Sequence, residues 1–221
     1  MNILAFDTSS SACSIALLVH TKVTAVHEIA PMQQAKTILP LIEDLLKNAK
    51  LSLEQLNAIA FGCGPGSFTG MRIASCVAQG LGFAAQRPLM PISSLAILAQ
   101  TAYQQKGWKK IMVAVDARMN QIYWAQYQIA SLDAKTVTLI GEELICAPNE
   151  VTLPEGEDWY GVGDGWALLT DALIKKSSSR PIEINLKILP HATALLSIAQ
   201  LKMQSGEGIV APAEALPSYL R

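Results

Sequence analysis

The sequence predicts an α/β protein of two lobes, and three observations support this. The chain has 221 residues, enough for two lobes of roughly 100 residues. An apolar strand that ends at an aspartate and leads into a hairpin occurs twice, in AFDTSSSACSIAL at Asp7 and in VAVDARMNQIYWAQY at Asp116. Helical and apolar segments follow each hairpin. We therefore expect duplicated βββαβα units, the second one reduced, with a first lobe over residues 1–106 and a second over 107–221 whose last segment packs back on the first.

Composition narrows the class of protein. Hydrophobic residues make up 51% and charged residues 16%, so the chain has apolar side chains to spare for a partner surface. The formal net charge is −1, and the only pairs of adjacent basic residues are at 109–110 and 175–176. This charge distribution does not favour direct binding of RNA or DNA. The four cysteines are widely spaced and no secretory signal or membrane span is evident, so we expect a cytoplasmic protein with reduced thiols.

The first lobe begins with β structure and continues with a helix. Residues 2–6 form the first predicted strand, and residues 13–19 and 23–29 form a hairpin. Apolar side chains recur at helical spacing over residues 37–48. Pro40 is expected in the first turn of that helix, because deeper in the helix its ring would clash with a preceding carbonyl.

The rest of the first lobe alternates strands and helices. Residues 58–61 are expected to form a strand, followed by a glycine-rich loop and a helix over 68–85. A strand over 89–92 and a helix over 94–105 complete the lobe.

In the second lobe the pattern starts again at Ile111. We expect strands at 111–115, 121–129, 136–144, 159–162 and 182–186, and helices at 167–175 and 192–204.

The loop GCGPGSFTG lies between a strand and a helix, as a phosphate-binding loop would. It does not fit either nucleotide motif, however. Gly70 is followed by Met71 and Arg72 instead of the lysine and hydroxyl residue of a Walker loop, and the glycine spacing fails the dinucleotide fingerprint. The glycines and Ser67 or Thr69 do fit a tight turn that caps the next helix.

The helix over residues 68–85 is apolar on nearly every side. Small residues recur every four positions, at Gly70, Ala74, Ala78 and Gly82, which lets another backbone approach closely. A helix of this composition must be buried on more than one side. Two interpretations remain open: a central helix inside its own lobe, or a helix that also packs against a partner.

Other chemistry has weaker support. The three histidines, His20, His27 and His191, do not have a metal-binding spacing, and no G-x-S-x-G motif is present. An aspartate at a strand end either caps its own turn or holds a magnesium-bound water, and its occurrence at two equivalent positions makes a nucleotide cleft worth considering. The candidate cleft residues are Asp7, Thr8, Ser9, Asp116, Arg118, Gly163, Asp164 and Gly165.

Three segments together resemble the bacterial TsaB (YeaZ) family: ILAFDTSSSACSIAL, GCGPGSFTGMRIASCVAQGL and AVDARMNQIYWAQY. The resemblance implies an actin-like, Hsp70-like two-lobe ATPase fold. It also implies a role in making N6-threonylcarbamoyladenosine beside the anticodon of tRNAs that read ANN codons. In that pathway TsaD performs the transfer, TsaE is an accessory ATPase, and TsaB is the non-catalytic partner of TsaD.

The resemblance also implies that the transfer chemistry is absent. TsaD binds its metal through an H-x-x-x-H pair, which falls on Ser94 and Leu98 in this chain. Neither side chain can replace an imidazole, so we expect no catalytic residue and no metal. Many relatives carry a histidine where this chain has Gln34, so any contribution of that histidine would be missing.

The family's dimerisation surface is implied to lie on the two helices over residues 37–48 and 68–85, which form a four-helix bundle with TsaD. The expected partner residues are Ile38, Leu41, Ile42, Leu45, Arg72, Ile73, Cys76, Gln79, Gly80 and Phe83. Alone, the chain would form a homodimer through the same surface. We expect tRNA to be contacted only through the complex, and no required cofactor, although a nucleotide could bind in the complex. The alternatives are a nucleotide hydrolase or kinase of the same fold with its own activity, and a metallopeptidase.

Overall fold

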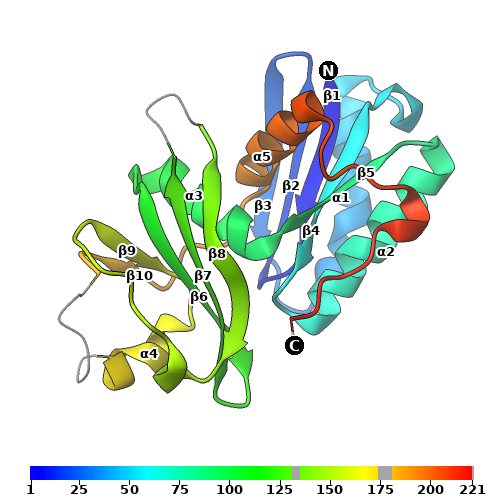
Figure 1. Ribbon diagram of the computed structural model, residues 1–221. Helices are drawn as coiled ribbons and strands as arrows, with labels where there is room; N and C mark the ends of the chain where they lie inside the picture. The colour runs from blue at the N-terminus through cyan, green and yellow to red at the C-terminus, as the bar shows by residue number, and fades with distance from the viewer. Residues whose placement is uncertain (131–134, 174–180, 221) are drawn as a thin grey trace. The chain divides into compact units, whose positions relative to one another are not determined.

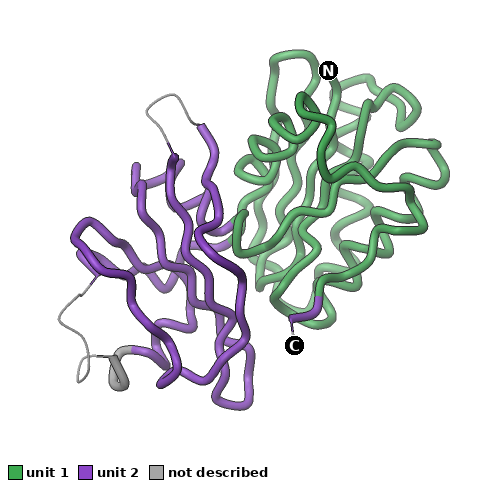
Figure 2. Tube along the Cα trace, viewed as in Figure 1, with its two compact units in different colours: residues 1–97, 190–218 green, residues 98–189, 219–221 purple. Residues whose placement is uncertain are grey.

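The computed structural model describes residues 1–130, 135–173 and 181–220. It confirms an α/β fold with two five-stranded sheets. The chain divides into two compact units, one of residues 1–97 and 190–218 and the other of residues 98–189 and 219–221 (Figure 2). Within the described residues no helix combines the length and apolar character needed to cross a membrane.

The sheet of the first unit has the strand order β3-β2-β1-β4-β5. Strands β1, β2 and β3 are joined by antiparallel pairs. Strand β4 pairs in parallel with β1, and β5 pairs in parallel with β4. Their bounds are Asn2–Asp7 for β1, Ala12–Val19 for β2, Lys22–Ile29 for β3, Ala58–Gly64 for β4 and Leu89–Ser93 for β5.

The second sheet repeats this topology in the order β8-β7-β6-β9-β10, with the same antiparallel and parallel pairs. The strands are Lys110–Arg118 (β6), Gln121–Ile129 (β7), Val137–Cys146 (β8), Trp159–Val162 (β9) and Ile184–Asn185 (β10). The duplication is therefore confirmed. The second copy is reduced as expected, because the segment between β8 and β9 contains only the short 3-10 turn η2 (Pro148–Glu150), where the first copy has a long helix.

Helices cover both faces of the first sheet (Figure 1). On one face, α1 (Gln34–Ala49) and α2 (Phe68–Ala85) pack over Leu4, Phe6 and Phe61. On the other face, α5 (Ala192–Ser205) packs over the alternating residues of the same strands. Because successive strand residues point to opposite faces, the mostly apolar and buried strands β1, β2 and β4 contribute side chains to a core on each face of the sheet.

The division of the chain differs from the expected boundary at residue 106. Helix α3 (Ser94–Lys106) starts in the first unit and continues in the second, and α5 (Ala192–Ser205) belongs to the first unit. The segment after α5, residues 209–218, which we call the C-terminal strap, also belongs to the first unit. It pairs Val210 with Leu89 and buries Ala215, so it is fixed to the edge of the sheet and to the core beside α2.

Most helix bounds match the expectation, but α1 does not. It starts at Gln34, so the expectation that Pro40 lies in the first turn is wrong; Pro40 lies inside the helix. Gln34 is buried and its side-chain amide donates to the carbonyl of Ser10 (2.8 Å), which holds the earlier start in place. Pro40 and Lys36 are both exposed, so water can satisfy the carbonyl that lacks a donor. The expected end of α4 (Trp166–Leu173) at Lys175 lies outside the described residues.

The start of α2 depends on a close backbone contact. A Cβ added to Gly70 would lie 1.9 Å from the carbonyl oxygen of Thr8. The Thr8 hydroxyl also donates to the carbonyl of Gly70 (2.7 Å), so the turn after β1 and the first turn of α2 are joined at one point.

We predict that Gly70→Ala destabilises the protein by about 2 kcal/mol or more, because the obstacle is backbone and cannot move aside cheaply. Denaturant unfolding at fixed pH measures the loss. The control is Gly80→Ala in the same helix, where an added Cβ meets no atom within 4 Å. Equal stabilities of the two variants would contradict this account of the loop.

Candidate functional site

The most constrained polar group of the first unit is the carboxylate of Asp7, at the end of β1. Asp7 is buried, and a Cβ on Gly62 would lie 1.8 Å from its Oδ2, so β4 passes directly against it. Its Oδ1 accepts hydrogen bonds from the amide and the hydroxyl of Ser9, at 3.0 and 2.9 Å. Its Oδ2 accepts one from the hydroxyl of Ser94 at 3.2 Å.

The glycine loop is tied to this carboxylate. The Ser94 hydroxyl that donates to Asp7 accepts a hydrogen bond from the amide of Gly64 (3.1 Å). The amide of Ser67, the N-cap residue of α2, donates to the carbonyl of Ser9 (2.8 Å). These two loop amides therefore serve the protein's own turn, and the buried side chains of Thr8 and Ser9 are also engaged within the protein. The arrangement fixes the start of α2.

Burial changes the acidity of Asp7. Desolvation raises its pKa from 3.8 to about 6, against the lowering effect of hydrogen bonds from Ser9 and Ser94. At neutral pH the carboxylate is therefore ionised at a cost in stability.

The second unit brings together its own set of candidate residues. The amide of Asp116 donates to the carboxylate of Asp164 (3.0 Å), and the Asp116 carboxylate accepts from the amide and guanidinium of Arg118, at 2.7 and 3.2 Å. Gly163 has a positive φ of 105°, and a Cβ there would lie 2.2 Å from the carbonyl oxygen of Ala114. The loop between β9 and α4 can thus lie against β6 at Ala114 only with glycine at position 163.

The eight residues of the expected cleft therefore form two clusters, one in each unit. Within the first unit Asp7, Thr8 and Ser9 adjoin one another, and within the second Asp116 and Arg118 adjoin the loop that contains Asp164. That these clusters hold a nucleotide remains a prediction. Within the described residues, no three His, Cys, Asp or Glu side chains gather in a way that could hold a metal.

The expected partner residues of α1 need correction. Ile38, Ile42 and Leu45 are buried in the core against the sheet, and Leu41 is half-buried beside them, so none of the first three can reach a partner. The partner surface on this helix was implied by the family resemblance, whereas the apolar periodicity of α1 marks the face that the helix turns to its own sheet. Leu39 is the large apolar residue that α1 exposes, at 50%.

Helix α2 divides differently between core and surface. Ala74 and Ala78 are buried, whereas Ile73 is half-buried against the core and Gln79 is also half-buried. Five of its exposed residues share one side of the helix at intervals of three or four positions; they are Phe68, Arg72, Cys76, Gly80 and Phe83, which we call the α2 stripe. Thr69 and Ala84 are also exposed, outside this stripe.

Two aromatic side chains give the α2 stripe its character. Phe83 is 80% exposed and Phe68 is 57% exposed. The Arg72 guanidinium lies 3.6 Å from the centroid of the Phe68 ring, a cation–π contact that keeps both side chains over the start of the helix. The stripe is therefore largely apolar and carries one cation.

Sequence reasoning missed some of this geometry. Phe68 was absent from the expected partner residues, although its position four residues before Arg72 signals a shared face. Ser94 was considered only as the position of a missing histidine, and its hydrogen bond to Asp7, 87 residues away, had no local signal.

We predict that Asp7→Asn raises the stability of the protein at neutral pH. A carboxyl whose pKa is raised by folding contributes stability that is fully present below the unfolded value of 3.8 and is lost as the pH rises through about 6. Near pH 7.5 the asparagine side chain of the variant does not ionise, so the variant avoids this loss of stability. The loss is at most on the order of 3 kcal/mol, because each unit of pKa shift corresponds to about 1.4 kcal/mol.

Unfolding free energies of both proteins between pH 4.5 and 7.5 measure the effect of Asp7→Asn. The gap between variant and natural protein should widen as the pH rises. A gap that does not change with pH would show that Asp7 is not buried with a raised pKa.

Comparison with known proteins places this geometry in a family. A family model described as tRNA N6-adenosine threonylcarbamoyltransferase, TsaD, matches residues 20–217. The tRNA threonylcarbamoyladenosine biosynthesis protein TsaB of Haemophilus influenzae is 36% identical, with 100% of this chain and 94% of the relative covered. The protein of the same name from Escherichia coli is also 36% identical, with 100% and 95% covered.

Solved structures agree. YeaZ from Pseudomonas aeruginosa is 43% identical and superposes with a TM-score of 0.90 over 99% of each chain. A second Pseudomonas aeruginosa structure, described as similar to the peptidase YeaZ, has a TM-score of 0.91 and 43% identity over 100% of this chain and 99% of that one. Fold, sequence and coverage agree, and the chain belongs to the TsaB (YeaZ) family.

Proposed function

We propose that this protein is a non-catalytic scaffold subunit that binds TsaD through the α2 stripe, together with TsaE, and so supports formation of N6-threonylcarbamoyladenosine in tRNAs that read ANN codons. The relatives' name as biosynthesis proteins of this modified nucleoside supports the pathway. In this proposal tRNA is bound by the complex and the protein acts in the cytoplasm. The chain itself needs no cofactor, although a nucleotide can accompany the complex.

The observation that carries the proposal is an exposed glycine, Gly80, in the interior of α2. Glycine inside a helix costs roughly 0.5–1 kcal/mol relative to alanine, so a helix interior needs a reason for it. Gly70 and Gly82 have a reason within the fold, because an added Cβ would collide with Thr8 or Leu89. Gly80 has no such reason, since it is exposed and an added Cβ meets nothing within 4 Å. A backbone outside this chain, approaching α2 closely, accounts for it.

The surroundings of Gly80 support the same conclusion. Phe83 and Cys76 lie one turn away on either side, and both are exposed, so the closest approach would be surrounded by apolar surface. An aromatic side chain that is 80% exposed is a poor choice for solvent and a common anchor in interfaces.

Family membership supports TsaD as the partner. A model named for the transferase TsaD matches residues 20–217 of this chain, a range that includes both α1 and α2, which supports a common ancestry of the two proteins. A surface that packs on its own counterpart can pack on a related counterpart, which supports a TsaD heterodimer and a homodimer when the chain is alone.

A non-catalytic role is supported by the positions that correspond to the metal-binding histidines of TsaD. One is Ser94, whose hydroxyl donates to Asp7, and the other is Leu98, which is buried. Neither offers an imidazole.

A second candidate is a nucleotide-dependent activity of the chain's own. The observation that favours it is the clustering of Asp116, Arg118 and Asp164 around a glycine turn in the second unit. Magnesium-dependent ATP hydrolysis by the pure chain that Asp116→Asn abolishes would support it, and a rate equal to the buffer blank would exclude it.

We predict that Gly80→Ala separates stability from binding. Alanine should stabilise the free chain by roughly 0.5–1 kcal/mol, yet the added methyl group should weaken TsaD binding by about tenfold or more because it keeps the two backbones apart. Denaturant unfolding and titration calorimetry with purified TsaD measure the two effects. A stabilised variant that binds TsaD with unchanged affinity would remove the argument from Gly80.

We also predict that Phe83→Glu weakens TsaD binding by at least about 2 kcal/mol, as expected for a buried aromatic anchor replaced by a charge. The fold should be retained, because Phe83 is exposed in the free chain. The matched control is Leu201→Glu on α5, which places the same charge on another exposed apolar helix position of the first unit. Equal affinities of the two variants would mean that α2 is not the binding surface.

A further inference from the structure

Two histidines far apart in the sequence are stacked in the first unit. His27 lies on β3, the outer strand of the sheet, and His191 is the N-cap residue of α5. Their ring centroids are 4.6 Å apart and the ring planes differ by 15°. Nothing in the proposed function uses this pair.

The hydrogen bonds fix the protonation state of His191. Its Nδ1 lies 3.2 Å from the backbone amide of Thr193 and 2.8 Å from the Thr193 hydroxyl. A backbone amide can only donate, so Nδ1 must accept and any ring proton is on Nε2. A proton on Nδ1 would remove this N-cap and place a positive charge at the helix N-terminus, where the macrodipole disfavours it.

His27 offers no compensating partner for a charge. Its Nδ1 is buried, and no hydrogen-bond partner for it exists among the described residues. On the neighbouring strand β2, Ser14 is the register partner of His27, and its hydroxyl accepts a hydrogen bond from the amide of Ala192. The start of α5 therefore contacts the sheet at two adjacent positions, His27 and Ser14. Both contacts join the N-terminus of α5 to the outer part of the sheet.

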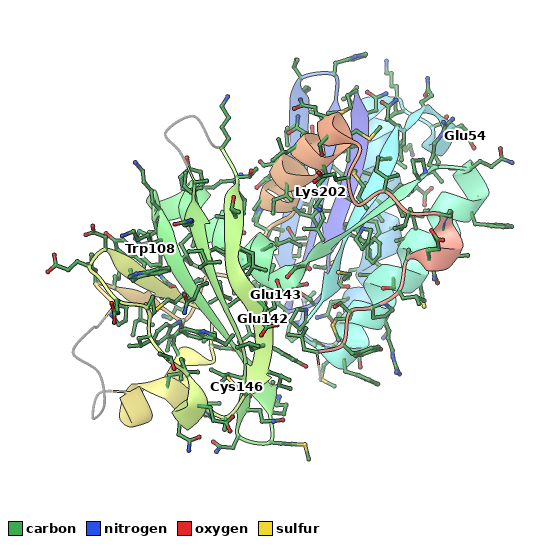
Figure 3. All side chains as sticks on the ribbon, in the orientation of Figure 1. Glu54, Trp108, Glu142, Glu143, Cys146 and Lys202 are labelled. Atoms are coloured by element: carbon green, nitrogen blue, oxygen red, sulfur yellow. The ribbon has the colours of Figure 1, made fainter. Side chains whose placement is uncertain are left out.

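The other ionisable groups near the pair are few. In the same cross-strand row Ser14 pairs with Asp7, two strands from His27 and therefore about 10 Å away. The other ionisable residues on the strands packed against α5 are Lys22 and Glu28 on β3, Cys13 on β2 and Cys63 on β4; β5 has no ionisable residue. Glu28 and Cys13 form a register pair next to His27 and, by strand alternation, point to the opposite face. The charged residue of α5 itself is Lys202 (Figure 3), in its last turn.

We propose that His27 and His191 form a pH-dependent latch that fastens the start of α5 to the outer strand of the first unit and opens in weakly acidic conditions. When neutral, the rings stack and His191 caps the helix. When either ring is protonated, a charge enters a half-buried stack that contains no carboxylate, and the cap is lost if the proton is on Nδ1. The first turn of α5 then separates more readily from β3, while the sheet remains intact.

The acidity of the pair agrees with this geometry. Burial lowers the pKa of His27, and burial together with the charge of His27 lowers that of His191. A histidine whose pKa is lowered by folding contributes stability that is complete above the unfolded value of about 6.5 and is lost as the pH falls below it. Asp7 acts in the opposite direction over part of the same range, so the global melting temperature does not isolate the latch and a local measurement is needed.

The test is amide hydrogen exchange of the full chain by NMR at pH 7.5, 6.5 and 5.5, expressed as protection factors corrected for intrinsic exchange. We expect protection of the first turn of α5 to fall by roughly fivefold at pH 5.5, the usual contribution of an N-cap, while protection of α1 changes much less. In His27→Phe/His191→Asn, which keeps an aromatic ring and a cap acceptor without titratable nitrogens, protection of α5 should be independent of pH.

Three further variants make the outcome decisive. His20→Asn removes a histidine from the β2–β3 turn of the same sheet and should retain the natural pH response of α5. Asp7→Asn should also retain the pH response of α5, which would show that the response does not come from the Asp7 carboxylate in the same cross-strand row as His27. If the double variant fails to fold, His27→Phe alone, with the cap intact, should reduce the response. The same pH response in natural protein and His27→Phe, or imidazole resonances of both histidines titrating at or above 6.5, would overturn the latch.

Discussion

The contact between the turn after β1 and the glycine loop is the constraint on which the first unit depends. Thr8 and Gly70 approach so closely that no side chain fits between them, and the Asp7 carboxylate reaches the same loop through Ser94. These contacts set where α2 begins, and the sheet below sets its direction. One side of α2 must therefore face the core and the other must face outward. The exposed stripe of Phe68, Arg72, Cys76, Gly80 and Phe83 follows from that placement.

This geometry explains how a loop in the position of a phosphate cradle serves another purpose. In a phosphate-binding loop the backbone amides point at the ligand. Here the amides of Gly64 and Ser67 donate to Ser94 and Ser9. The buried carboxylate beside them would also repel an anion once it is ionised. The loop and its aspartate act as a rigid support for α2, and the proposed scaffold function uses the support.

Much of the fold could be predicted from the sequence because its signals are local. The repeated strand, aspartate and hairpin around Asp7 and Asp116 reveal the duplication, and α2 was predicted with the bounds it has. The assignment of residues 190–218 to the first unit was less accessible, because it depends on contacts between distant segments such as Ala192 with Ser14. Ile38, Ile42 and Leu45 were expected at a partner surface from the family resemblance, but they are buried. Their periodicity records burial and does not say which surface buries them.

The most direct test of the scaffold role is an omission assay for the modified nucleoside. TsaD, TsaE, the threonylcarbamoyl-adenylate synthase, ATP, threonine, bicarbonate and unmodified tRNA are combined with and without this protein, and N6-threonylcarbamoyladenosine is quantified by mass spectrometry. A required scaffold gives product only when the protein is present, and that product should be lost with Phe83→Glu but not with Leu201→Glu. Equal product without the protein would contradict the scaffold role and would direct attention to the clusters around Asp7 and Asp116.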